Sequence, residues 1–211
     1  MDTFYNENKK TKIKCYSLKI TKEMKDKALE FAKSIVLSDN QFSRLLPSEV
    51  RYNEDIELQK KIEIQRTYMG KLGEIAFAEL LKHYNKQFDC SEMFEIFPGQ
   101  ENYDSYDFLT VNGETVDIKT GFRENHSRLL VNLDQFTNNP KDFYVAVKLN
   151  AIDEDEHTLV DWDSVTRADI LGYVEYNYMR DNCKIRNFGE GDAKYRDYNW
   201  LLQIDRLLNS F

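Results

Sequence analysis

Hydrophobic residues recur along the chain at two spacings, one typical of helices and one typical of strands. The helical spacing predicts a helix after Thr21, whose side chain can cap it, and a long helix from Glu54 to about Asn85. A helix of that length is unusual in a globular domain, so a break is expected near Gly70. Small residues in its second half are expected to let it lie close to a sheet: Gly70, Gly73, Ala76 and Ala78.

Runs of β-branched and aromatic residues predict strands at residues 13–20, 94–97, 129–133, 143–149 and 170–176. Polar stretches predict loops or turns at residues 38–48, 134–140 and 182–197. Residues 198–208 have helical spacing and predict a packed terminal helix. Several tyrosines of the C-terminal third are assigned to the core, with the lining of a nucleic-acid groove as the alternative: Tyr173, Tyr176, Tyr178, Tyr195 and Tyr198.

The stretch from Tyr103 to Thr120 predicts a β-hairpin, because two strand-like runs flank Asn112-Gly113. A two-residue loop would put Asp107 and Asp117 on different sides. A three-residue loop, with Gly113 in the left-handed conformation, pairs Asp107 with Asp117 and leaves an apolar opposite face. We therefore expect the three-residue loop, with the Cβ atoms of the two aspartates about 5 Å apart, close enough for their carboxylates to hold one cation.

Asp107, Asp117 and Lys119 place three ionisable side chains on one small hairpin. Charges of this kind are costly to bury unless they are paired or bind a metal ion. Because like charges opposite each other destabilise a sheet, a divalent cation between the aspartates would reverse that penalty. Glu74 interrupts the apolar second half of the long helix. It is either a solvent-facing residue at one edge or a third carboxylate directed at the same cation.

Composition sets the limits of the interpretation. The chain has 211 residues, of which 41% are hydrophobic and 31% charged, so a globular fold is expected. The formal charge of −8 argues against a general nucleic-acid coat but leaves room for a local basic groove. Three widely spaced cysteines and no long apolar run indicate a cytoplasmic protein with reduced thiols and no membrane span.

The order Glu74, then Asp107, then Asp117-Ile118-Lys119 resembles the PD-(D/E)xK nuclease superfamily, over roughly residues 70–149. Tyr106 stands where the family often has proline. The resemblance implies an α/β fold of the restriction endonuclease type, with an α/β/α core, a mixed central sheet and an N-terminal helical extension. We expect a single domain, divided into an extension (1–66), a nuclease core (67–150) and a C-terminal completion (151–211).

The resemblance also implies Mg²⁺-dependent cleavage of phosphodiester bonds in DNA, with Mn²⁺ as a substitute. Mg²⁺ needs few protein ligands, so Asp107, Asp117 and the carbonyl of Ile118 are the expected set. Lys119 would orient water or stabilise charge, and Glu74 would bind a second ion or position water. DNA contacts are expected from residues near the active strands: Arg123, Arg128, Lys141 and Gln135.

Two other interpretations remain open at this point. The first is a catalytically inactive module of the nuclease fold that binds nucleic acid or serves assembly. The second is an unrelated α/β protein in which Asp117-Ile118-Lys119 merely ends a surface strand. That protein would hold Asp107 and Asp117 apart or in solvent. A symmetric dimer is expected only because two sites cut two strands.

Overall fold

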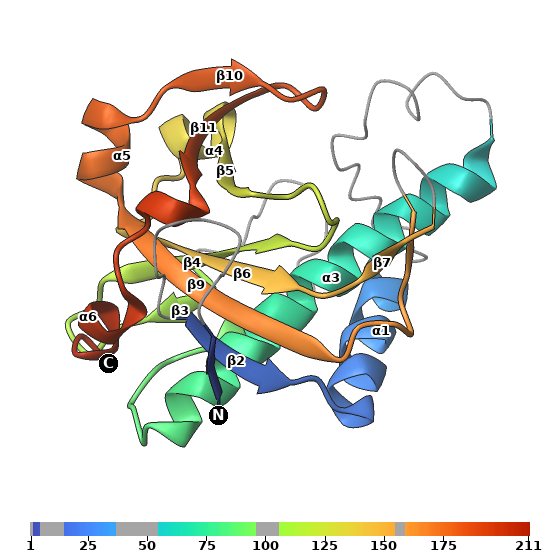
Figure 1. Ribbon diagram of the computed structural model, residues 1–211, viewed down its shortest axis with the longest axis horizontal. Coiled ribbons are helices and arrows are strands. Elements are labelled where there is room, and N and C mark those ends of the chain that lie inside the picture. The colour runs from blue at the N-terminus through green and yellow to red at the C-terminus, as the bar shows by residue number, and fades with distance from the viewer. Residues whose placement is uncertain (1, 5–14, 37–54, 96–105, 155–158) are drawn as a thin grey trace.

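The computed structural model describes residues 2–4, 15–36, 55–95, 106–154 and 159–211 (Figure 1). The chain is a mixed α/β protein with helices on both faces of a mixed central sheet, which confirms the predicted fold class. The loop expected at residues 38–48 lies outside the described residues.

The main sheet has six strands in the order β1-β2-β9-β6-β4-β3. Their bounds are Asp2–Phe4 for β1, Cys15–Lys19 for β2, Phe108–Leu109 for β3, Thr115–Gly121 for β4, Phe143–Leu149 for β6 and Arg167–Glu175 for β9. Strands β4 and β6 run parallel, and the other neighbouring pairs run antiparallel. The strands predicted at residues 13–20, 143–149 and 170–176 are thus confirmed.

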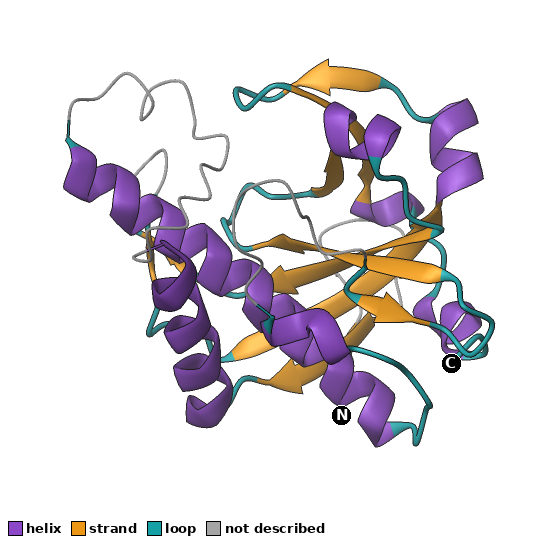
Figure 2. Cartoon of the chain, turned by 180° about the vertical axis from the view of Figure 1, so that it is seen from behind, coloured by secondary structure: helices purple, strands orange, loops and turns teal. Residues whose placement is uncertain are grey.

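Two helices, α1 (Lys22–Val36) and α3 (Ile56–His83), cover one face of this sheet, and α3 crosses it diagonally (Figure 2). The predicted cap of α1 is confirmed, because the Met24 N–H donates to Thr21 Oγ1 at 3.3 Å. The rings of Phe77 on α3 and Phe108 on β3 meet edge to face at 5.1 Å. These contacts belong to the larger of the hydrophobic cores.

The break expected near Gly70 is wrong, because α3 is continuous through Gly70 within the described residues. Glycine costs a helix about 1 kcal/mol relative to alanine, and the complete burial of Met69 and Leu72 outweighs that cost. Gly73 confirms the expected close approach to the sheet. A Cβ at Gly73 would lie 2.0 Å from Thr120 Oγ1 of β4, whereas a Cβ at Gly70 would meet nothing within 4 Å.

The other face of the main sheet carries a second layer. Strands β5 (Arg128–Asn132), β10 (Ile185–Asn187) and β11 (Asp192–Asp197) form a small sheet in the order β10-β11-β5. It packs with α4 (Leu133–Asn138) and α5 (Tyr176–Asn182) around a second hydrophobic core. Figure 1 shows this layer above the main sheet, at the end opposite α1.

Several polar segments are more regular than the sequence predicts. The loop expected at residues 182–197 is instead the hairpin of β10 and β11, and Gly189 and Gly191 turn it with φ of 96° and 98°. The turn expected at 134–140 lies largely within α4. The strand expected from Phe94 is wrong where it is described, because Ser91–Phe94 is a 3₁₀ helix, η1.

The chain ends in shorter elements than expected. The helix predicted at residues 198–208 forms only as η2 (Tyr198–Trp200) and α6 (Ile204–Leu208). Trp200 is 65% exposed rather than packed, whereas Ile204 and Leu207 are buried as predicted. Strands β7 (Ile152–Asp153) and β8 (Val160–Asp161) form a separate two-stranded sheet.

The N-terminal segment is built into the main fold. Strand β2 pairs with β9 inside the main sheet, and α3 runs through residue 66, where the expected extension ends. The larger core takes side chains from Tyr16, Phe77 and Leu207 alike. The three cysteines are free thiols. Within the described residues, no helix is long and apolar enough to cross a membrane.

Candidate active site

The hairpin of β3 and β4 sets Asp107 against Asp117. Its strands pair Phe108 with Val116 and Leu109 with Thr115, so Asp107 comes directly before the paired stretch and Asp117 directly after it. The loop has three residues, as expected: the Thr110 N–H donates to the Glu114 carbonyl at 3.0 Å. Gly113 closes the loop with φ of 78°, in the left-handed region.

Asp107 is fixed by the backbone of the neighbouring strand. Its carboxylate accepts the N–H of Ile118 at 2.6 Å, and its own N–H donates to the Val116 carbonyl at 3.1 Å. Phe108, Val116 and Ile118 are buried in the larger core, so the apolar face of the hairpin lies where it was predicted. The carboxylate is therefore held at the edge of the sheet by the same residues that anchor the hairpin.

Asp117 and Lys119 share the face of β4 that looks toward the second layer, because they lie opposite Tyr144 and Ala146 of that core. Asp117 is 7% exposed. Lys119 Nζ lies 2.6 Å from Asp117 Oδ2, a contact of opposite charges without hydrogen-bond geometry, and the buried oxygen has no hydrogen-bond partner. Lys119 Nζ donates instead to Gln135 Oε1 of α4 at 2.9 Å.

Glu74 is not a solvent-facing residue. It lies on α3 with a side chain 13% exposed, and the almost fully buried Lys71 Nζ is 2.5 Å from its Oε2. Lys71 also donates to the Met93 carbonyl and lies 4.4 Å from the centre of the Phe31 ring. The carboxylate of Glu74 is thus held by a cation of its own helix.

The acidic groups act on one another electrostatically. Burial raises the pKa of Asp107 well above its ordinary value, and the negative charges of Glu74 and Asp117 raise it further. The hydrogen bond from the Ile118 N–H and the charge of Lys119 act in the opposite direction, lowering the same pKa. The pKa of Asp107 therefore depends on all three of the other candidate residues: Glu74, Asp117 and Lys119.

The described residues contain no group of three or more His, Cys, Asp or Glu side chains placed to hold a metal ion. Asp107 and Asp117 are two carboxylates, and Asp117 Oδ2 is a buried oxygen that lies 2.6 Å from Lys119 Nζ and has no hydrogen-bond partner among the described residues. Mg²⁺ takes oxygen ligands and keeps several waters, so a pair of carboxylates fits it. The donor set fits a hard divalent cation.

The four residues expected to contact DNA lie in different environments. Arg123 is 6% exposed and pairs with Asp153 at 3.4 Å, and Lys141 is 3% exposed with its Nζ 2.5 Å from Asn139 Oδ1. Both side chains are buried in this structure, and their contact with DNA phosphates stays a prediction. Arg128 is 39% exposed and pairs with Asp197, and Gln135 holds Lys119.

Sequence reasoning missed a basic cluster beyond the end of β4. His126 Nδ1 accepts the N–H of Phe122 at 3.1 Å, and Lys148 donates to the carbonyls of Arg123 and His126. Burial, followed by the charges of Lys148 and Arg123, lowers the pKa of His126 to about 4. Burial lowers the pKa of Lys148 to about 8. No spacing in the sequence marks this cluster, whereas Lys71 could have been found three residues before Glu74.

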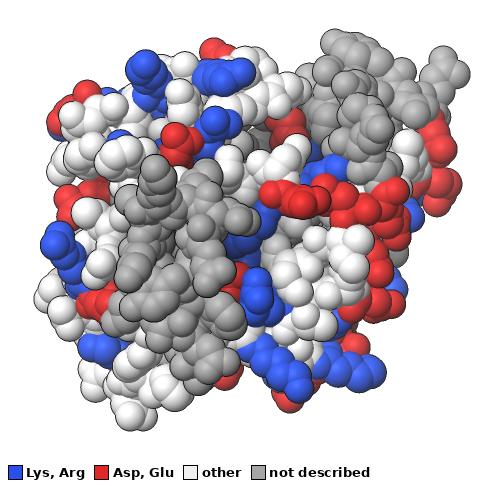
Figure 3. Space-filling view, in the orientation of Figure 1, with Lys and Arg blue, Asp and Glu red and all other residues white. Residues whose placement is uncertain are grey.

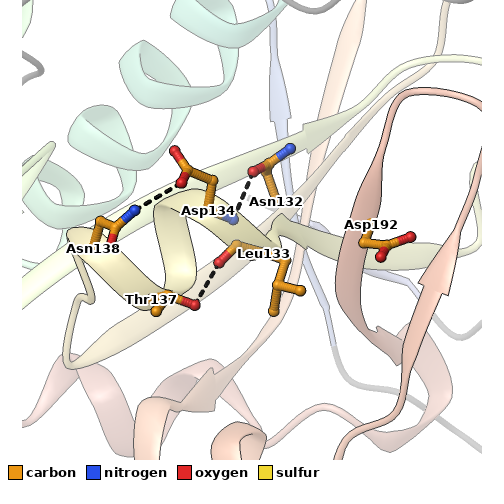
Figure 4. Close-up of a pocket in the computed structure, with 6 residues that line it drawn as sticks. All are labelled: Asn132, Leu133, Asp134, Thr137, Asn138 and Asp192. Atoms are coloured by element: carbon orange, nitrogen blue, oxygen red, sulfur yellow. Dashed lines mark hydrogen bonds between the residues drawn. The ribbon is translucent and has the colours of Figure 1, made fainter.

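A shallow hollow of about 420 Å³ lies beside α4, but it is separate from the candidate site (Figure 4). Its lining groups satisfy one another: Asn132 Oδ1 accepts the Asp134 N–H, and Asn138 Nδ2 donates to Asp134 Oδ1. Gln135, which contacts Lys119, does not line it. The hollow therefore reflects the capping of a short helix.

Comparisons with protein-family models, with curated proteins and with solved structures found no match to this chain.

Proposed function

We propose that this chain is a Mg²⁺-dependent endonuclease that hydrolyses phosphodiester bonds in DNA, with Mn²⁺ able to replace Mg²⁺. One observation carries the proposal. Asp107 and Asp117 meet across one hairpin, Glu74 acts on Asp107 from a neighbouring helix, and Lys119 lies against Asp117. This is the arrangement that the resemblance to the PD-(D/E)xK nucleases implies.

In the proposed reaction, Asp107, Asp117 and the Ile118 carbonyl would hold the ion. When bound, the ion supplies charge stabilisation at the phosphate and a water of lowered pKa. Lys119 orients that water or stabilises the charge that develops on the phosphate, and Gln135 positions its ammonium group. Glu74, held by Lys71, positions water or a second ion.

Two competing functions are weighed against this one. A catalytically inactive nucleic-acid-binding module is the alternative; the presence of both aspartates and the lysine favours the enzyme over it. An unrelated protein in which Asp117-Ile118-Lys119 ends a surface strand would expose these side chains separately, and the burial of Asp117 speaks against that. A symmetric dimer is part of the proposal only for cutting both strands.

Nicking of a supercoiled plasmid tests the proposal. We expect nicking with Mg²⁺, none with EDTA, and loss of about a hundredfold or more in Asp117→Asn and in Lys119→Ala. Asp134→Asn is the matched control, because it removes an exposed carboxylate of α4 outside the site, and it should cleave like the native protein. Cleavage that persists in Asp117→Asn would remove the proposed mechanism. DNA binding without cleavage by the native protein would favour the inactive module.

A further inference from the structure

The small sheet of β10, β11 and β5 has one face that lies away from the second hydrophobic core. Each residue of one strand has a partner on the adjacent strand, and the side chains of two such partners lie on the same face of the sheet. Arg186 lies opposite Ala193, Tyr195 opposite Leu130, and Asp197 opposite Arg128. We call this the outer face; its members are Lys184, Arg186, Ala193, Tyr195, Asp197, Arg128, Leu130 and Asn132.

The opposite face of the small sheet is already used. Leu129 and Val131 of β5 point into the second hydrophobic core. Lys194 of β11 is buried, and its Nζ donates to the carbonyls of Met179 and Arg180 on α5. On the outer face Lys184 and Arg186 are exposed, Arg128, Tyr195 and Asp197 are half-buried, and Ala193 is buried.

Aromatic rings and guanidinium groups alternate on the outer face. The rings of Tyr195 and Phe188, which follows β10, meet edge to face at 5.4 Å. The Arg128 guanidinium lies 5.7 Å from the Tyr195 ring and 5.8 Å from the Phe188 ring. Arg186 lies 5.4 Å from Phe188 on the outer strand. Aromatic rings and guanidinium groups therefore contact one another along the outer face.

The charge of this face is opposite to that of the whole chain. The formal net charge of the protein is −8, yet Lys184 and Arg186 form no salt bridge among the described residues. Asp197, the acidic member of the outer face, is paired with Arg128 at 2.7 Å. Figure 3 shows basic side chains over the region of β10 and β11, while acidic side chains gather over the beginning of α3.

We infer that the outer face binds a single-stranded segment of nucleic acid, by stacking unpaired bases on Tyr195 and Phe188 and contacting phosphates through Arg186 and Lys184. Base faces are available only where bases are unpaired, so the rings favour a single strand over a duplex. The inference rests on the proposed function for nucleic acid as the ligand. Residues 122–127 connect β4, which carries Asp117 and Lys119, to β5, which contributes Arg128 and Leu130 to the outer face.

Fluorescence anisotropy in EDTA tests this inference with three labelled probes of one sequence: a single-stranded DNA, a single-stranded RNA and the DNA duplex. We expect a single strand to bind more tightly than the duplex, and the DNA and RNA arms identify which one is preferred. Tyr195→Leu, which keeps apolar volume but removes the ring, should weaken single-strand binding about tenfold, the loss of one stacked base. Arg186→Ala should weaken it about threefold and reduce the salt slope by about 0.7.

Two control variants keep the design specific. Trp200→Leu removes a 65% exposed aromatic ring that lies off the outer face, against Arg196, and Arg180→Ala removes an exposed cation that pairs with Asp181 on α5. Both should bind the single strand as the native protein does. The inference is overturned if Trp200→Leu weakens binding as much as Tyr195→Leu, or if Tyr195→Leu changes nothing.

The same experiment separates this inference from the proposed nuclease function. Single-strand binding that depends on Tyr195, without plasmid nicking in Mg²⁺, would support the inference and contradict the proposed nuclease function. Plasmid nicking by a protein that binds single strands no more tightly than the duplex would contradict the inference and support the nuclease function. Circular dichroism of Tyr195→Leu verifies that its sheet is intact.

Discussion

Lys71 and Glu74 form an ion pair whose energetic role depends on its burial. Their side chains are 4% and 13% exposed, and both lie on α3. On the same helix Lys82 and Glu79 are also three residues apart, but their side chains are 61% and 39% exposed. A charge left alone in the interior is strongly destabilising, whereas an exposed pair contributes little. The two pairs therefore make a matched comparison.

We expect Lys71→Met to lower the free energy of unfolding by about 3 kcal/mol, because it leaves the Glu74 carboxylate buried without its cation. Lys82→Met should change it by less than about 0.5 kcal/mol. Urea unfolding followed by circular dichroism measures both. The double variant Lys71→Met/Glu74→Gln should regain part of the loss, and equal effects of the two single lysine variants would contradict the account.

His126 makes stability depend on pH in a defined window. Its pKa is about 4 in the folded protein because of burial and the charges of Lys148 and Arg123, while an unfolded histidine titrates near about 6.5. Between these values the unfolded chain binds more protons, so the free energy of unfolding should fall as the pH falls from about 6.5 to about 4.

The change at His126 that tests this is His126→Asn, which retains an acceptor for the Phe122 N–H but no longer titrates. Urea unfolding across the same pH window should show a shallower fall for this variant. His83→Asn, which removes an exposed histidine at the end of α3, should keep the native slope. A native slope in His126→Asn would show that other groups cause the effect.

At the level of elements, α3 and β4 are brought together by one glycine. A Cβ at Gly73 would collide with Thr120 Oγ1 at 2.0 Å, and at Gly70 it would meet nothing within 4 Å. We expect Gly73→Ala to destabilise the protein by about 2 kcal/mol through overpacking, and Gly70→Ala to stabilise it by up to about 1 kcal/mol through helix propensity. Thermal unfolding of both variants measures the difference, and the same sign for both would contradict it.

The elements that could be predicted from sequence were those with strong local patterns. The hairpin of β3 and β4 follows from Asn112-Gly113, and its register follows from the apolar face that Phe108, Val116 and Ile118 share. The hairpin of β10 and β11 was missed because its strands are polar. Lys194 is buried there because carbonyl groups of α5 accept hydrogen bonds from its ammonium group. That partner comes from tertiary structure, which local pattern does not contain.

For the whole molecule, the sequence could predict which acidic residues meet but not how each is neutralised. Glu74 and Asp117, from separate parts of the chain, both raise the pKa of Asp107 through their negative charges. Buried Arg123 pairs with Asp153 of β7, on another segment, whereas buried Lys141 contacts Asn139, two residues earlier in its own loop. The exposure of an arginine or lysine that follows a strand of the candidate site cannot be predicted from its position in the sequence, because it depends on how the rest of the chain packs around it.

The central claim is that Asp107 and Asp117 together bind a divalent cation beside Lys119. Titration calorimetry with Mg²⁺ tests it most directly, because it requires no substrate. The account predicts binding by the native protein, its loss in Asp117→Asn, its retention in Asp134→Asn, and binding at least as tight in Lys119→Met, where no ammonium competes for Asp117. The absence of Mg²⁺ binding by the native protein, or equal binding by Asp117→Asn, would contradict it.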